Sequence, residues 1–236
     1  MAYLDWISDE ALVSSVSHLL NKAKQASSDS VKKFSKNVID PFSALFQITG
    51  FDIDHDTWKQ SEVARQAQKT LQNHIGDFHQ NVLGSIKGWE NKGVGSVIDL
   101  LNTEQKVIAE VKNKYNTLSG GQLANLYKSL DGLISPKSSI YHGYTAYYVA
   151  IIPKKSERSN KPFTPSNREK GARETVNENI RQIDGASFYS LVTGNEGALS
   201  ELFQVLPAVI QKVSDKEISA EDSVILTNYF KDAFGK

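Results

Sequence analysis

The sequence predicts an α/β protein in which helices flank a mixed central β-sheet and a helical N-terminal part precedes that sheet. Apolar residues recur at helical spacing through the first 90 positions, and the period changes to two over positions 106–114. An aromatic and β-branched run at 144–152 is typical of a buried strand. We expect a single domain over 1–236, with a mainly helical part at 1–90, a core sheet at 91–190 and C-terminal helices at 191–236.

The composition excludes several classes of protein. Apolar residues make up 39% and charged residues 23% of the chain, with 27 basic and 27 acidic side chains, which fits a globular protein and excludes a disordered one. The absence of cysteine excludes disulfides and thiolate metal sites. There is no run of about 18 apolar residues and no signal-peptide pattern at the start. We therefore expect no membrane segment and a cytoplasmic location.

The first 90 residues are expected to form separate helical stretches. Apolar residues at 11–20 repeat at spacings of one, three and four, and the serine-rich positions 27–30 are expected to interrupt that helix. A short apolar face at 31–39 is expected to stop near Asp40-Pro41, because the residue before a proline avoids the helical conformation. A long amphipathic helix is predicted at 61–86.

The predicted sheet begins with a β-hairpin. The apolar run 97–101 is followed by a turn at 102–105 and by the alternating stretch 106–114, whose period of two indicates a strand. The further expected elements are a helix around 123–130, a strand at 144–152, a long surface loop at 153–170, a strand at 180–183, and helices at 187–192, 196–213 and from 219 onward.

The hairpin is predicted to bring three chemically active side chains together. If the turn lies between Asn102 and Val107, Asp99 faces Glu110, and Cβ atoms of facing residues are roughly 5 Å apart. Glu110 and Lys112 are two positions apart on one strand and share a face. Two carboxylates this close repel each other unless a cation lies between them, and Mg²⁺ prefers oxygen ligands. A neighbouring lysine can orient or deprotonate a water, which is the chemistry of phosphodiester hydrolysis.

An acid and a lysine two positions apart also occur on ordinary solvated strands, where they have no catalytic role. Here the pair comes with an upstream aspartate, an apolar run around that aspartate and a tight turn. This context favours the catalytic interpretation.

The set Asp99…Glu110-Val111-Lys112 resembles the D…(D/E)xK signature of the PD-(D/E)xK nuclease superfamily, with Ile98 where a proline often precedes the first acid. Longer phrases resemble type II restriction endonucleases of the subgroup that cuts GGNCC. These phrases lie at 76–80, 109–117 and 183–189, and the resemblance covers positions 60–210.

The resemblance implies a restriction-endonuclease-like fold and a homodimer on a palindromic site in double-stranded DNA, each subunit cutting one strand with Mg²⁺. It implies that Asp99 and Glu110 hold the metal and that Lys112 serves the attacking water. The Val111 carbonyl would add a metal ligand.

The long helix before the hairpin offers a further catalytic acid, which members of the superfamily often have. Asp77 is the favoured candidate and Glu62 the other, and the alternative is an acid that simply faces solvent. His74 and His79 are five positions apart and do not share a helix face, as a metal-binding pair would. We expect His79 to be a buried, hydrogen-bonded residue.

Positive charge concentrates in positions 154–181, which hold eight cations and four anions. Arginine can bridge guanine O6 and N7, so this segment suits the recognition of a GC-rich site. The alternative is that these charges face water or contact only phosphates, which position a protein without reading sequence. The candidate DNA-binding residues are Lys161, Arg168, Arg173, Arg181, Asn177 and Asn179.

Two other functions stay open on the sequence alone. A repair or junction-resolving nuclease would use the same groups on the same fold but would give no fixed set of DNA fragments. A non-catalytic DNA-binding module, or a helical protein that binds a partner, would carry the acid–lysine pair by accident and would not depend on magnesium.

Overall fold

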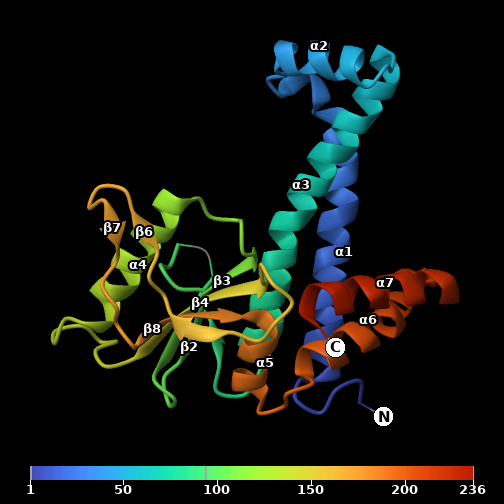
Figure 1. The fold of residues 1–236 in the computed structure, drawn as a ribbon. Coiled ribbons are helices and arrows are strands. Elements are labelled where there is room, and N and C mark those ends of the chain that lie inside the picture. The colour runs from blue at the N-terminus through green and yellow to red at the C-terminus, as the bar shows by residue number, and fades with distance from the viewer. Residues whose placement is uncertain (1, 94, 236) are drawn as a thin grey trace.

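The computed structural model describes residues 2–93 and 95–235, and a six-stranded mixed sheet lies at its centre (Figure 1). In sheet order the strands are β1 (Glu90–Asn91), β2 (Leu100–Asn102), β3 (Val107–Lys114), β4 (Thr145–Ile152), β8 (Ile180–Asp184) and β5 (Asn160–Pro162). The middle strands β3, β4 and β8 run parallel, and the strands on either side of them are antiparallel. The predicted mixed sheet is therefore confirmed.

Helices cover both faces of this sheet. They are α1 (Asp9–Lys32), the short 3₁₀ helix η1 (Phe34–Lys36), α2 (Pro41–Gly50), α3 (His55–Gly84), α4 (Gly120–Ile134), α5 (Gly185–Thr193), α6 (Ala198–Ser214) and α7 (Ala220–Phe234). In Figure 1, α4 lies on one side of the sheet, and α3 and α5 lie on the other.

The alternation predicted for β3 divides the hydrophobic core into two clusters. Ala109 and Val111 belong to the cluster that contains side chains of α3, α5 and α6, whereas Ile108 belongs to the cluster under α4. Parallel strands in the middle of a sheet are buried on both faces, which explains why β4 is apolar almost without interruption. The next side chain on the α4 side of β3 is Glu110, so the core also fixes the direction of a predicted catalytic group.

The helices α1 and α3 form an arm that projects from the body, with η1 and α2 at its far end (Figure 1). The interruption predicted at positions 27–30 was wrong, because α1 continues to Lys32. Within the helix, the Ser30 hydroxyl donates to the Ala26 carbonyl at 2.8 Å and Asp29 pairs with Lys33. These bonds satisfy polar side chains that would otherwise compete with the helical backbone.

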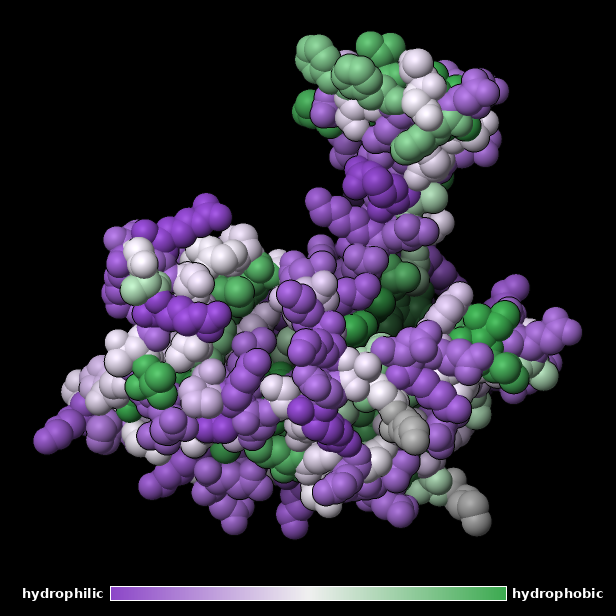
Figure 2. Space-filling view, viewed as in Figure 1, coloured by the Kyte–Doolittle hydropathy of each residue, from purple (hydrophilic) through white to green (hydrophobic). Residues whose placement is uncertain are grey.

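The helix α2 was not predicted. Asp40-Pro41 begins this helix as well as ending the preceding stretch, since the Asp40 side chain accepts the N–H groups of Phe42 and Ser43. A proline at the first helical position is favourable because its missing N–H has no partner there in any case. All ten residues of α2 are described and none is buried. Figure 2 shows the result as an apolar cap on an otherwise polar arm.

The long surface loop predicted at 153–170 was also wrong in part. Asn160–Pro162 forms β5, which pairs with β8, and a small hairpin follows, made of β6 (Ser166–Asn167) and β7 (Ala172–Arg173). A buried Glu174 holds this hairpin by accepting bonds from Asn167 and Lys170. In the described part of the chain, no helix has the length and apolar character needed to cross a membrane.

Candidate active site

The β2–β3 hairpin has the register that the sequence predicts. Asn102 pairs with Val107, and Leu100 pairs with Ala109. Strand β2 is short, so regular pairing with β3 stops at the pair Leu100–Ala109, one residue before Asp99. Asp99 therefore lies where the hairpin opens, at the point where β3 has a free edge.

Asp99 is held to β3 by two hydrogen bonds. Its backbone N–H donates to the Ala109 carbonyl at 2.9 Å, and its Oδ2 accepts the N–H of Val111 at 2.7 Å. The carboxylate thus takes the place of a backbone acceptor on the free edge of β3. This fixes the side chain beside that of Glu110.

Glu110 and Lys112 complete the group. Lys112 Nζ lies 2.5 Å from Glu110 Oε1, and the two side chains are only 24% and 14% exposed. The carboxyl of Glu110 also lies beside that of Asp99, and each acts on the pKa of the other. The structure therefore brings together the two acids and the lysine that the sequence analysis placed at one site.

The two acids resist ionisation in each other's presence. Burial and, after it, the neighbouring Asp99 charge raise the pKa of Glu110 to about 7 against the opposing effect of Lys112. Burial also raises the pKa of Asp99, while the Val111 N–H and the Lys112 charge lower it. Asp99 and Glu110 are half-buried and share one ammonium group, which does not fully offset the effect of burial on their pKa values.

The donor set fits a small divalent cation with oxygen ligands. In residues 2–93 and 95–235, no three histidine, aspartate or glutamate side chains are close enough to form a metal-binding group. The side-chain ligands would then be the two carboxylates of Asp99 and Glu110. Mg²⁺ commonly binds through one or two carboxylates and completes its shell with waters and phosphate oxygens.

The candidate acids of α3 lie at different places. Asp77 is beside the site, because its charge raises the pKa of Asp99, and its Oδ2 lies 2.9 Å from Nδ1 of His74. Glu62 precedes Asp77 by 15 positions, about 22 Å along a helix. Its carboxylate binds Arg65 at 2.6 Å, so the structure does not bring Glu62 to the two acids of the hairpin.

Comparison with known proteins settles the family. The family model described as Eco47II restriction endonuclease matches residues 4–215. The chain belongs to this family. It is 50% identical to the type II restriction enzyme Eco47II of Escherichia coli over the full length of both chains. It is 32% identical to the type II restriction enzyme Sau96I of Staphylococcus aureus over 88% of this chain and 80% of that enzyme.

Membership of the Eco47II restriction endonuclease family confirms the resemblance to type II restriction enzymes. It also confirms the enzyme class expected from the sequence, a site-specific deoxyribonuclease. The predicted restriction-endonuclease-like fold agrees with the mixed sheet and its flanking helices.

In this family member a polar groove of about 510 Å³ lies between α3 and the free edge of β3. Asp77 and Lys112 both line it, so the groove reaches the candidate catalytic groups. The sequence analysis missed most of its walls, namely Lys69, Gln72, Asn73, Gln80, Asn116 and Thr117. Those on α3 recur at spacings of three and four, and this polar stripe is the signal that could have indicated the groove.

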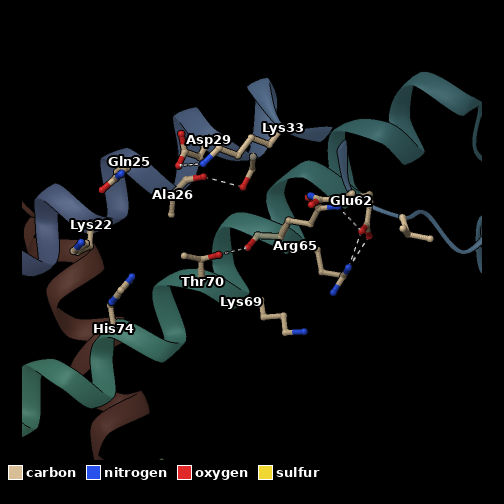
Figure 3. Close-up of a pocket in the computed structure, with 14 residues that line it drawn as sticks. Lys22, Gln25, Ala26, Asp29, Lys33, Glu62, Arg65, Lys69, Thr70 and His74 are labelled. Carbon is tan, nitrogen blue, oxygen red and sulfur yellow. Dashed lines mark hydrogen bonds and ion pairs between the residues drawn. The ribbon is translucent and has the colours of Figure 1, made fainter. Parts of the chain in front are cut away.

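A second polar groove continues up the arm between α1 and α3 (Figure 3). Lys69 lines both grooves. Lys22, Lys33 and Arg65 add positive charge, although Lys33 and Arg65 each pair with an acid of their own helix. A track of cations therefore leads from the candidate active site along the arm.

The predicted DNA-binding residues fall into two groups. Three are engaged within the protein: Arg181 donates to Asn160, Arg173 to the Thr164 carbonyl, and Asn177 to Asp131. The other three, Lys161, Arg168 and Asn179, are exposed.

The hydrogen bond expected for His79 is confirmed, but its side chain is half-buried instead of buried. Its Nδ1 lies 2.8 Å from the hydroxyl of Tyr189, and desolvation lowers its pKa to about 4. His74 pairs with Asp77, as described above.

Proposed function

We propose that this chain is a Mg²⁺-dependent type II restriction endonuclease that hydrolyses both strands of double-stranded DNA at GGNCC and acts in the cytoplasm. The observation that carries the proposal is the convergence of Asp99, Glu110 and Lys112 at the edge of an open polar groove. The family membership supports the reaction class, and the sequence phrases described above support the site.

Each group has a distinct role in the proposed reaction. Asp99, Glu110 and the Val111 carbonyl would hold Mg²⁺, which supplies a Lewis acid and lowers the pKa of bound water. Lys112 is held by Glu110 Oε1 in the metal-free protein. Once that carboxylate is neutralised by another cation, the ammonium group is free to orient the attacking water or to stabilise negative charge on phosphorus.

The substrate strand is proposed to lie in the groove between α3 and β3. Lys69 stands where this groove meets the one along the arm, so it would contact phosphates on one side of the cut. Phosphate contacts position the duplex and make binding salt-dependent. Asp77 would be a further acid beside the metal-binding carboxylates, because its charge raises the pKa of Asp99.

Sequence reading is assigned to the segment around β6 and β7. Arg168, Lys161 and Asn179 can contact DNA in their present exposed positions. Arg173, Arg181 and Asn177 would first have to exchange their internal bonds for bonds to DNA.

A homodimer is proposed because the described residues of one chain carry one set of candidate catalytic groups, whereas cleavage of a duplex requires cutting two strands. The apolar cap on α2 supports this. Phe42, Phe46 and Phe51 are 73%, 72% and 69% exposed. At about 200 Å² per ring, these three expose about 400 Å² per chain, half of the roughly 800 Å² that each partner buries in a standard interface.

The nuclease proposal is tested by digesting a plasmid of known sequence with and without Mg²⁺ and mapping the ends. We expect fixed fragments with ends at GGNCC in Mg²⁺ and none in EDTA. A changing set of fragments would favour a repair or junction-resolving nuclease, and cleavage that survives in Lys112→Ala without metal would contradict the assigned chemistry.

The dimer proposal has a separate test. Phe42→Ser together with Phe46→Ser should sediment as a monomer where the unmodified chain sediments as a dimer, because both side chains are exposed and their loss removes only the contact surface. Tyr229→Ser on α7, at a side chain that is 64% exposed, is the matched control. An unchanged sedimentation coefficient in the double variant would rule out the α2 contact.

A further inference from the structure

A buried tyrosine beside the candidate active site has no hydrogen-bond partner for its hydroxyl. Tyr148 lies on β4, is 1% exposed and packs its ring against Phe163 at 5.0 Å between centroids. Within the described residues its phenol oxygen is one of two fully buried side-chain polar atoms that lack a partner. An unpartnered buried hydroxyl is costly and rare in a native protein, so it calls for an explanation.

The place of Tyr148 in the sheet supplies one. In the parallel ladder between β3 and β4, Tyr148 is the register partner of Glu110. Register partners point to the same face of a sheet, so the phenol ring and the carboxylate stand side by side on the α4 face. The Glu110 charge is close enough to add to the effect of burial, and together they raise the pKa of Tyr148 to about 12. A phenol hydroxyl is a hydrogen-bond donor at neutral pH.

Glu110 is otherwise occupied in the metal-free protein. Its Oε1 contacts Lys112 Nζ, and its carboxyl lies beside that of Asp99. Binding of a cation by the two acids would replace both of these contacts. The carboxylate would then need a fixed donor to keep its orientation, and Tyr148 is the buried donor on the neighbouring strand.

We propose that Tyr148 is a positioning residue of the active site, whose hydroxyl donates a hydrogen bond to the Glu110 carboxylate when that carboxylate binds Mg²⁺. The proposal rests on the proposed function. Hydrogen bonds to metal-binding groups commonly change metal affinity or activity by about 10–100-fold.

The test is Tyr148→Phe, which removes one oxygen atom that makes no bond in the metal-free protein. We expect the thermal midpoint without metal to stay the same or to rise. Calorimetric titration of the DNA-free protein with Mg²⁺ should show affinity weakened about tenfold, and cleavage at a fixed Mg²⁺ concentration should slow by at least as much. Tyr147→Phe is the matched control, because the side chain of Tyr147 belongs to the opposite core cluster. It should change neither the Mg²⁺ affinity nor the rate of cleavage.

A double-mutant cycle separates positioning from a general effect on the fold. The loss of Mg²⁺ affinity caused by Tyr148→Phe should disappear when Glu110 is already Gln, because the two side chains act as a unit. Wild-type Mg²⁺ binding in Tyr148→Phe, or additive losses in the cycle, would overturn the role of Tyr148 and leave the nuclease proposal standing. Failure of the unmodified chain to bind Mg²⁺ would overturn both.

Discussion

Two glutamates in this protein, one buried and one half-buried, lie beside lysines, and their surroundings shift their pKa values in opposite directions. Glu174, 2% exposed, accepts bonds from Lys170 at 2.5 Å and from Asn167 at 2.6 Å, and these two bonds hold its pKa below the ordinary value. Glu110, 14% exposed, has Lys112 at the same distance, yet burial and the adjacent Asp99 raise its pKa to about 7.

The difference lies in the number of charges that share the site. The first glutamate has a cation and an amide donor to itself, and the hairpin of β6 and β7 is held by that fully satisfied group. The second shares one lysine with another carboxylate. A glutamate–lysine contact at 2.5 Å thus has its charges balanced in one place and not in the other, which a search for ion pairs alone would not distinguish.

The largest expected difference between the two glutamates is in catalysis. Glu110→Gln, Asp99→Asn or Lys112→Ala should each slow plasmid cleavage at saturating Mg²⁺ by about 10³-fold, since each removes charge at the reacting phosphate. Glu174→Gln should leave the rate of the chemical step within about threefold of the unmodified chain, because its glutamine keeps the packing of the hairpin. A severe loss of single-turnover rate in Glu174→Gln would show that the two sites are coupled.

The second prediction concerns pH and stability. Folded Glu110 holds its proton to about pH 7, whereas an unfolded chain releases it near 4.5, so its contribution to stability falls as the pH rises between these values. The unfolding free energy of metal-free Glu110→Gln, relative to the unmodified chain, should therefore rise by up to about 3 kcal/mol from pH 5 to pH 8. Urea unfolding at both pH values measures this.

The same measurement on Glu174→Gln should show no change in relative stability between pH 5 and pH 8. The lowered pKa of Glu174 stabilises the fold above about pH 4.5, and that contribution is lost as the pH falls through the lowered value. The variant should therefore lose stability relative to the unmodified chain only as the pH rises to about 4.5, and the difference should stay constant above that pH. His79, whose pKa is lowered to about 4, titrates equally in all these proteins and cancels in the differences. Parallel slopes for the two variants would refute the comparison.

The third prediction tests how far Glu174 holds its hairpin. Glu174→Ala should lower the free energy of unfolding by about 2 kcal/mol at pH 7, because the buried amide of Asn167 loses its acceptor and Lys170 its partner. Chemical denaturation checks the value. Lys128→Ala, which breaks an exposed pair with Glu169, should cost less than about 1 kcal/mol and serves as the control.

The smallest expected effect is the competition between protons and metal. Since Glu110 must lose its proton to bind a cation, the Mg²⁺ concentration for half-maximal cleavage should rise about tenfold for each pH unit below 7. Measuring Mg²⁺ dependence at pH 6, 7 and 8 provides the test. A requirement for Mg²⁺ that does not change with pH would show that the acids are already ionised without metal.

The parts of the fold that could be predicted are those set by local periodicity. The alternation over 106–114 and the turn at 102–105 determined the hairpin register, and with it the positions of Asp99, Glu110 and Lys112. The strand at 144–152 was recognised from its run of aromatic and β-branched residues, which fits side chains that are buried on both faces.

The parts that could not be predicted depend on contacts distant in the sequence or on the dual roles of single residues. Ser30 belongs to the serine-rich stretch that was expected to interrupt the helix, yet its hydroxyl donates to the Ala26 carbonyl and the residue stays within α1. Pro41 can end one segment or begin the next, and only the Asp40 cap decides which. Strand β5 forms because it pairs with the edge of β8. The position of Asp77 beside Asp99 depends on the packing of α3 against β3, which no local pattern predicts.

The continuity of α3 has a consequence for which sequence changes the arm tolerates. Its 30 residues run without a break from the apolar end of the arm to the wall of the groove between α3 and β3, so substitutions on its exposed surface alter little beyond local charge. A single inserted residue between Glu62 and Asp77 would instead turn one end against the other by about 100° and lengthen the helix by about 1.5 Å. The outer part of α3 is therefore expected to tolerate substitutions on its exposed surface but not insertions or deletions.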